Sequence, residues 1–185
     1  MNRLIVFAGR LLDNFFKGVN YCRKEYQKSK LESCGENVYL GADCILTEKN
    51  IQMGHDVYVG PKCVFQSTYG KIVIGNHVMF GPGVNIHGGN HKIRELGVHL
   101  DDVSPKKKGD DGIVTIGDDC WIGANAVILA NVTIGTGSVI GGAVVTQDVP
   151  PYSVYVGSHI PKIRQRFSSD DTKRHLEMLD QRYKE

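Results

Sequence analysis

The residues best suited to chemistry in this chain stand in one short segment, Asn85-Ile-His-Gly-Gly-Asn-His91. Its two glycines carry no side chain and let another molecule approach the backbone closely. An imidazole can accept a proton near neutral pH, so His91 could serve as a general base. His87 and His91 are four residues apart, and His55 or His77 could add a third ligand for zinc. The segment therefore permits either acid–base or metal chemistry.

The elements that must position this segment follow a repeat of six residues. Isoleucines recur at this interval from Ile116 to Ile140, and most are followed by glycine. The same pattern appears earlier, with interruptions, at Cys34, Leu40, Leu46, Met53, Val59, Phe65, Ile74, Phe80 and Ile86. No helical period explains a repeat of six, whereas a short strand followed by a tight corner does.

The slot three residues before each repeat position indicates where the chain turns. It mostly holds residues that tolerate a positive φ, namely Asn37, Asp43, Asp56, His77, Gly83, Gly89, Asp119, Asn125, Asn131 and Gly137, with Lys62 a poorer fit. Three hexads complete one coil, and coils stack at roughly 4.8 Å. We therefore expect an all-β solenoid of about five coils, residues 34–160, stabilised by stacking.

The repeat stops at His91 and resumes near Val114. The polar residues between these points, 92–112, form a protruding loop that coil stacking does not need. Loops of this length are usually functional. A smaller irregularity lies between Phe65 and Ile74, where the repeat gains three residues.

Four motifs together give the chain a family resemblance. They are Gly88-Gly-Asn-His91 before a loop, Val114-Thr-Ile-Gly-Asp-Asp-Cys-Trp-Ile-Gly-Ala-Asn-Ala126, Val145-Thr-Gln-Asp-Val-Pro-Pro-Tyr-Ser153, and Lys162-Ile-Arg-Gln-Arg-Phe-Ser168 before a final helix. Over roughly residues 34–180 the chain resembles the hexapeptide-repeat O-acetyltransferases, which include xenobiotic and galactoside or maltose acetyltransferases. The resemblance implies a left-handed parallel β-helix and a homotrimer, with coenzyme A in a groove between two prisms.

The resemblance also implies roles for individual residues. His91 would be the general base that takes the proton of an acceptor hydroxyl, and acetyl-CoA would be the co-substrate. Gln66, His87 and Asn90 are the candidates for binding the acceptor. Contacts to coenzyme A would come from Gly123, Ala124, Gly141, Thr146, Gln147, Lys162 and Arg164. The last two could meet phosphates, because clustered cations suit them.

The function expected is a coenzyme A-dependent O-acetyltransferase acting on a hydroxyl of a sugar or small molecule. A bacterial surface-polysaccharide precursor is the first acceptor that we expect, and an antibiotic is the second. One alternative is a metal hydratase of the γ-carbonic anhydrase type, which needs three converging histidines. The other is a non-catalytic trimeric scaffold on the same fold. The long loop disfavours the first alternative, and the presence of His91 disfavours the second.

Composition is that of one soluble globular domain. The chain has 185 residues, 41% of them hydrophobic, and a net charge of +2, so charge alone implies no nucleic-acid partner. Its five cysteines form no CxxC pair. We expect them to be small core residues in a reducing compartment, the cytoplasm, with no metal site.

The N-terminal segment, residues 1–33, carries an apolar stripe that predicts a helix. The stripe consists of Leu4, Phe7, Ala8, Leu11, Leu12, Phe15, Phe16 and Val19. We expect this helix to cap the first coil or to pack on a neighbouring subunit, because solenoids need end caps. Peripheral docking on an anionic membrane is the alternative that we rank second. The apolar run Leu4–Gly9 is too short for a signal peptide or a membrane span.

The C-terminal segment, residues 161–185, is expected to form a turn and a helix. Ser168 and Asp171 are spaced as in a capping box. Thr172, Leu176, Leu179 and Tyr183 would give the helix an inward-facing stripe.

Overall fold

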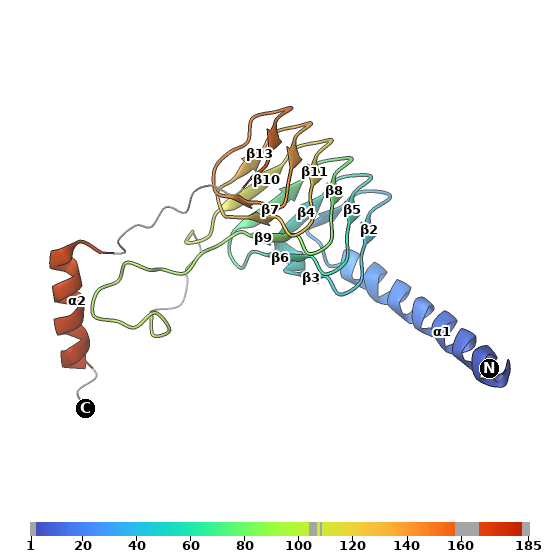
Figure 1. The fold of residues 1–185 in the computed structure, drawn as a ribbon, viewed down its shortest axis with the longest axis horizontal. Coiled ribbons are helices and arrows are strands. Elements are labelled where there is room, and N and C mark those ends of the chain that lie inside the picture. Colours follow the sequence, from blue (N-terminus) through green and yellow to red (C-terminus); the bar gives the residue numbers. More distant parts are fainter. Residues whose placement is uncertain (1–2, 104–106, 108, 158–166, 183–185) are drawn as a thin grey trace.

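The computed structural model describes residues 3–103, 107, 109–157 and 167–182 (Figure 1). Helix α1 (Arg3–Lys28) precedes a prism of short strands, and helix α2 (Ser169–Arg182) follows it. A single 3-10 turn, η1 (Glu48–Asn50), leads into the second coil. Figure 1 shows both helices projecting away from the prism.

Three sheets form the sides of the prism. Sheet A contains β1 (Ser33–Cys34), β4 (Ile51–Met53), β7 (Lys71–Ile74), β10 (Ile113–Ile116) and β13 (Thr133–Ile134). Sheet B contains β2 (Tyr39–Leu40), β5 (Tyr58–Val59), β8 (Met79–Phe80), β11 (Trp121–Ile122), β14 (Val139–Ile140) and β16 (Val154–Tyr155). Sheet C contains β3 (Ile45–Leu46), β6 (Val64–Gln66), β9 (Asn85–His87), β12 (Val127–Ile128) and β15 (Val144–Val145).

Every coil contributes one strand to each sheet, and all of the strand pairs are parallel. Five coils are complete, and β16 adds a further strand to sheet B. The chain is a left-handed parallel β-helix. Its stacked parallel coils confirm the solenoid expected from the hexads, and its hand is the one that the family resemblance implies. Strand pairing is in register, so each repeat position stacks on the same position of the next coil.

The core is a set of apolar columns inside this prism. In sheet C, for example, Phe65, Ile86 and Ile128 are in register on successive coils and are fully buried. Phe65 also meets Phe80 of sheet B, with ring centroids 5.0 Å apart. A single coil could not bury these side chains, so the stacked coils stabilise one another.

The corners adopt the predicted backbone conformation at most of the expected positions. Positive φ values between 55° and 63° occur at all of the predicted Asn, Asp and His positions, from Asn37 to Asn131, and Gly83 and Gly137 also have positive φ. The prediction is wrong at Gly89, which does not have a positive φ. Lys62 has φ 59° as well, although it lacks the short polar side chain that eases this conformation. The hexad therefore imposes the corner even on an unfavourable residue.

Replacing Lys62 with glycine is expected to raise the free energy of unfolding by about 0.5–1 kcal/mol. The left-handed conformation costs an ordinary residue about 1–2 kcal/mol, and part of the gain is lost to the greater chain entropy of glycine. Urea unfolding would measure the change. Lys49→Gly in η1, where φ is not positive, is the matched control and should lower stability. The idea fails if both variants destabilise the protein equally.

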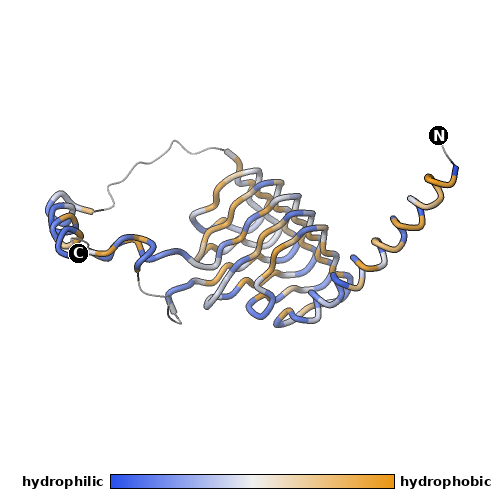
Figure 2. Tube along the Cα trace, turned by 90° about the horizontal axis from the view of Figure 1, so that it is seen from below, coloured by the Kyte–Doolittle hydropathy of each residue, from blue (hydrophilic) through white to orange (hydrophobic). Residues whose placement is uncertain are grey.

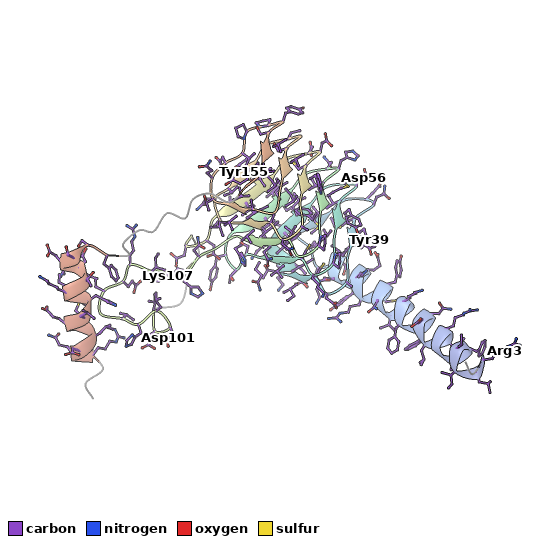
Figure 3. The ribbon with its side chains drawn as sticks, viewed as in Figure 1. Arg3, Tyr39, Asp56, Asp101, Lys107 and Tyr155 are labelled. Atoms are coloured by element: carbon purple, nitrogen blue, oxygen red, sulfur yellow. The ribbon has the colours of Figure 1, made fainter. Side chains whose placement is uncertain are left out.

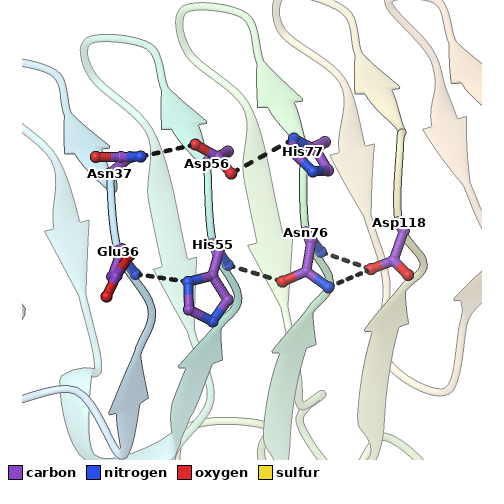
Figure 4. A network of polar contacts seen from close by, with 7 residues as sticks. All are labelled: Glu36, Asn37, His55, Asp56, Asn76, His77 and Asp118. Atoms are coloured by element: carbon purple, nitrogen blue, oxygen red, sulfur yellow. Dashed lines mark hydrogen bonds and ion pairs between the residues drawn. The ribbon is translucent and has the colours of Figure 1, made fainter.

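A polar ladder runs along the corner between sheets A and B (Figure 4). The His55 N–H donates to the side-chain oxygen of Asn76 at 2.8 Å, and the Asn76 N–H donates to Asp118 at 2.6 Å. On the adjacent positions, His77 lies 3.6 Å from the carboxylate of Asp56. His55 and His77 therefore link successive coils at this corner.

Helix α1 does not cap the first coil, so that form of the prediction is wrong, whereas packing on a neighbouring subunit stays a prediction. None of its residues is buried, and its side chains spread into the space around it (Figure 3). Only its last turns contact the prism, where the Lys28 ammonium donates to the Val38 carbonyl at 3.0 Å and Lys24 lies over the Tyr39 ring. The helix leaves the end of the prism instead of crossing it (Figure 1). No helix in the described part of the chain is long and apolar enough to cross a membrane.

Helix α2 begins as predicted but packs differently. The Asp171 N–H donates to the Ser168 hydroxyl at 3.1 Å, as in the expected cap. The expected inward stripe is wrong, because Leu176 is exposed and no residue of the helix is buried. Instead α2 packs on the loop, where the Gly97 N–H donates to His175 Nδ1 at 3.1 Å. Tyr183 lies outside the described residues.

The cysteines are only partly core residues. Cys63 and Cys120 are buried and Cys44 is half-buried, whereas Cys22 and Cys34 are exposed. Cys22 lies on the projecting α1, and Cys34 lies on the first coil, where no preceding coil covers it. All five are free thiols.

Candidate functional site

The predicted chemistry-bearing residues meet at the corner where the strands of sheet C end. A pocket of about 440 Å³ opens there. It is lined by Thr47, Gln66, Ser67, Thr68, His87, Gly89, Asn90, His91, Asp111 and Leu129. The pocket thus contains the expected base, His91, and all three of the residues expected on the acceptor side.

Coil stacking explains why these residues are neighbours. Gln66 ends β6 and His87 ends β9, and the two are paired in register. Thr47 and Leu129 occupy the equivalent positions after β3 and β12, where their N–H groups donate to the next coil. Each of four successive coils therefore contributes at least one residue to the pocket.

Five pocket residues were not named from the sequence: Thr47, Ser67, Thr68, Asp111 and Leu129. Ser67 is only 2% exposed, and its hydroxyl has no hydrogen-bond partner among the described residues. It lies against Gly88, where a Cβ would come within 2.3 Å of the Ser67 oxygen. A buried unpaired hydroxyl costs free energy unless something else supplies its partner. The only sequence signal for Ser67 was the irregularity between Phe65 and Ile74.

The ends of the protruding loop are attached firmly to the prism beside His91. The Gly112 N–H donates to the Gly88 carbonyl at 2.8 Å, and the Gly88 N–H donates to Gln66 at 2.8 Å. Asp111 accepts from the Tyr69 N–H at 3.1 Å. His91 itself is exposed, directly after this anchored stretch. The backbone that carries the imidazole is therefore held while the ring stays accessible.

An ion pair closes the loop just beyond His91. The Lys92 ammonium lies 3.2 Å from the carboxylate of Asp110. The same carboxylate accepts from the Lys107 N–H at 2.6 Å. The Lys107 N–H, and then Lys92, lower the pKa of Asp110 below its usual value. The carboxylate is thus charged, and the ion pair stays formed, throughout the neutral range.

The predicted coenzyme A residues lie along the two edges of sheet C. Gly123 and Gly141 follow β11 and β14 at the corner between sheets B and C, and Ala124 is exposed beside them. Thr146 and Gln147 follow β15 and are exposed. Since Leu129 donates to the carbonyl of Val145, Thr146 lies one coil beyond the pocket on the same edge. Lys162 and Arg164 lie outside the described residues.

The coil stacking explains why glycine occupies the corner between sheets B and C. A Cβ on Gly123 would come within 2.8 Å of the Ile140 carbonyl oxygen. Gly41, Gly60 and Gly81 occupy the same corner on earlier coils and have equally close neighbours. Glycine is therefore required by stacking, and its presence at this corner does not by itself mark a cofactor site.

The histidines considered for zinc do not converge within one chain. His87 and His91 share the pocket, but His55 and His77 belong to the corner between sheets A and B. Among the described residues there is no cluster of three or more His, Cys, Asp or Glu side chains that could hold a metal.

Comparison with known proteins agrees with the fold. Residues 113–147 match the family model for the bacterial transferase hexapeptide (six repeats), so the prism is that of a hexapeptide-repeat protein. Galactoside O-acetyltransferase of Escherichia coli K12 is 30% identical over 149 residues, which cover 77% of this chain and 68% of that protein. The chain belongs to the hexapeptide-repeat acetyltransferases.

Two further relatives show the extent of the similarity. A hexapeptide-repeat acetyltransferase of Vibrio cholerae, solved in complex with acetyl coenzyme A, has a TM-score of 0.63 at 27% identity, covering 73% of this chain and 71% of that one. A Schizosaccharomyces pombe protein with an acetyltransferase name is 38% identical over 122 residues, which are 63% of this chain and 53% of that protein. The chain thus spans about half the length of several curated relatives that it matches.

Proposed function

We propose that this protein is an acetyl-CoA-dependent O-acetyltransferase with His91 as its general base. The observation that carries the proposal is the pocket in which His91 meets Gln66, His87 and Asn90. Such a pocket offers one accessible base and several polar groups that can orient a hydroxyl. The relationship to the E. coli galactoside enzyme and to the V. cholerae acetyl-CoA complex supports the same reaction.

The proposed reaction is a direct transfer. The acceptor O–H gives its proton to the imidazole of His91 while its oxygen attacks the thioester carbonyl carbon. The tetrahedral intermediate then collapses, the C–S bond breaks, and the imidazolium returns the proton to the departing thiolate. Acetyl-CoA supplies an already activated acyl group, so no covalent enzyme intermediate is needed. Backbone N–H groups near the pocket are the natural donors to the oxyanion.

The acceptor is proposed to be a sugar or another small molecule with a free hydroxyl. Polar side chains from several coils line the pocket, and Ser67 adds a buried hydroxyl that has no hydrogen-bond partner within the described part of the chain. Groups of this kind suit the several hydroxyls of a sugar, because each can pair with one of them. A surface-polysaccharide precursor remains the acceptor of first choice. The free, partly exposed thiols are consistent with work in the reducing cytoplasm.

Coenzyme A is proposed to lie along sheet C, from the corner with Gly123 and Gly141 toward Thr146 and Gln147. These residues surround the last two complete coils, and the path reaches the pocket along the edge that includes Leu129. The outer face of sheet C is largely apolar there, with Val144 exposed. The extended, partly apolar pantetheine arm of coenzyme A can lie on this surface of sheet C if a second protein surface covers its other side.

A second copy of the chain is proposed to provide that second surface, in a homotrimer. The outer face of sheet B carries a column of large apolar side chains that solvent would otherwise cover: Tyr39, Tyr58, Met79, Trp121 and Val154. The outer face of sheet A is mostly polar in the same register, for example at Gln52, Thr115 and Thr133. Exposed apolar surface of this kind marks a contact between proteins. Cyclic symmetry would then give three equivalent sites.

The experiment that tests the function is an acceptor screen. The purified protein would be incubated with acetyl-CoA and a panel of sugars and hydroxyl-bearing small molecules, and free thiol would be measured over time. We expect acceptor-dependent thiol release for at least one sugar class, with the O-acetyl product seen by mass spectrometry. If no hydroxyl acceptor accelerates thiol release, and amines do so instead, the O-acetyltransferase assignment is wrong.

Shortening the loop is expected to change the acceptor while sparing the basic machinery. Residues 96–108 would be replaced by a short Gly/Ser linker, which keeps His91 and the Lys92–Asp110 ion pair. Surface loops tolerate such changes at small entropic cost, so the prism should stay folded. We expect the KM for the best acceptor to rise at least about tenfold, with slow acetyl-CoA hydrolysis retained. Unchanged KM and selectivity would show that the loop plays no part in acceptor choice.

A further inference from the structure

Helix α1 exposes a large apolar surface that the prism does not use. Seven of its bulky apolar residues are more than half exposed: Leu4, Ile5, Phe7, Leu11, Leu12, Phe15 and Phe16. Figure 2 shows this apolar character along the projecting helix. A monomeric protein in water seldom leaves so many large apolar side chains on one element.

The helix is strongly two-sided. At 100° per residue, the apolar side chains from Phe7 round to Phe16 cover about half of its circumference. The opposite side carries Arg3, Arg10, Lys17, Lys24 and Lys28 within a narrow arc. The exceptions to this division are Val6 and Tyr21 on the basic side, and Arg23 and Glu25 on the apolar side. An apolar half facing a basic half is the pattern of helices that lie in a membrane interface.

Charge separates α1 from the rest of the molecule. The helix contains six Lys or Arg residues and two acidic ones, a net charge of +4. The whole chain carries only +2, so the remainder is net negative. Lys24 and Lys28 contact the prism at the base of the helix, which leaves Arg3, Arg10 and Lys17 along its projecting part. A cationic arm on an otherwise slightly acidic protein is complementary to an anionic surface.

We propose that α1 is an in-plane membrane anchor that binds the surface of an anionic lipid bilayer. Its apolar half would enter the boundary between headgroups and acyl chains, and its cations would stay near the phosphates. The helix is too polar to span a bilayer, which fits this orientation. At 1.5 Å per residue its 26 residues extend about 39 Å, enough for seven turns of contact.

A second copy of α1 is a poorer occupant for this face. Paired helices bury a narrow seam of positions repeating every 3.5 residues, whereas the apolar surface here is about twice as wide. Association of several copies would also gather their like charges, while an anionic bilayer neutralises them. The last turns of α1 are attached to the prism, so membrane binding would hold the whole enzyme at the surface.

Vesicle flotation of the full chain tests the proposal. Vesicles of phosphatidylcholine alone would be compared with vesicles containing about one third phosphatidylglycerol. We expect binding to the anionic vesicles at least about tenfold above the neutral ones, and a loss of this preference at high salt. Absence of binding to anionic vesicles would overturn the proposal.

Paired variants identify the responsible face. Leu12→Glu with Phe15→Glu should abolish flotation, and Arg10→Glu with Lys17→Glu should remove the preference for anionic lipid. Leu176→Glu on α2 is the matched control, because Leu176 is 59% exposed and Leu12 is 57% exposed. All of these side chains are outside the core, so thermal unfolding should not change. If the Leu12/Phe15 variant floats with the vesicles like the control, the proposal is wrong. The proposal is also wrong if the only effect of this variant is a lower particle mass in light scattering, because α1 then serves another purpose.

Discussion

Replacing His91 with alanine is expected to lower kcat/KM for acetyl transfer by about 10²–10⁴-fold, the usual contribution of a general base. The imidazole is exposed at the pocket and is not part of the apolar columns, so the prism should be unaffected. Acceptor-dependent thiol release would measure the rate, and calorimetry would show that coenzyme A still binds.

The matched control is His77→Asn, at the corner between sheets A and B. Asparagine tolerates the positive φ of 56° found there, so this variant should remain stable and active. Near-normal turnover in the His91 variant would contradict the mechanism. Equal losses in both variants would show that the effect is structural.

Replacing Trp121 with glutamate is expected to dissociate the proposed homotrimer and remove activity. Trp121 is 52% exposed in the single chain and lies between Met79 and Val139 on the apolar face of sheet B. A carboxylate buried there without a partner would cost several kcal/mol at each contact. Light scattering should show the mass falling from three times 20.4 kDa to 20.4 kDa.

Thr115→Glu, on the outer face of sheet A, is the control for that change. It introduces the same charge in the same type of strand, where the neighbours Val73 and Thr133 do not form an aromatic column. This variant should stay trimeric and active. A wild-type protein that is an active monomer, or a Trp121 variant that remains a trimer, would refute the proposed assembly.

Much of the fold could be predicted from the sequence because it is built from local rules repeated many times. Each hexad specifies its own strand and corner, and each coil packs only on its neighbouring coils. A wrong prediction for one hexad therefore does not change the prediction for the others. Positive φ at positions such as Asn125 and burial at Ile128 follow directly from the spacing. The same regularity made the break at His91 visible.

The pocket could be predicted only in part. Gln66, His87, Asn90 and His91 were identified through a motif and an irregularity in the repeat, and the structure brings them together. Thr47 and Asp111 carry no such signal. They reach the pocket because coil stacking and the closed loop bring together residues that are distant along the chain.

The sequence by itself determined the prism, since a period of six with turn residues at a constant position allows few other folds. Only the tertiary structure decided what surrounds it. An amphipathic pattern says that a helix has an apolar face, but it does not say what covers that face. In this chain α1 leaves its apolar half exposed, and α2 meets Gly97 of the loop instead of a coil. Those outcomes depend on where the chain enters the first coil and where it leaves the last one, which is a property of the assembled coils and not of any local pattern.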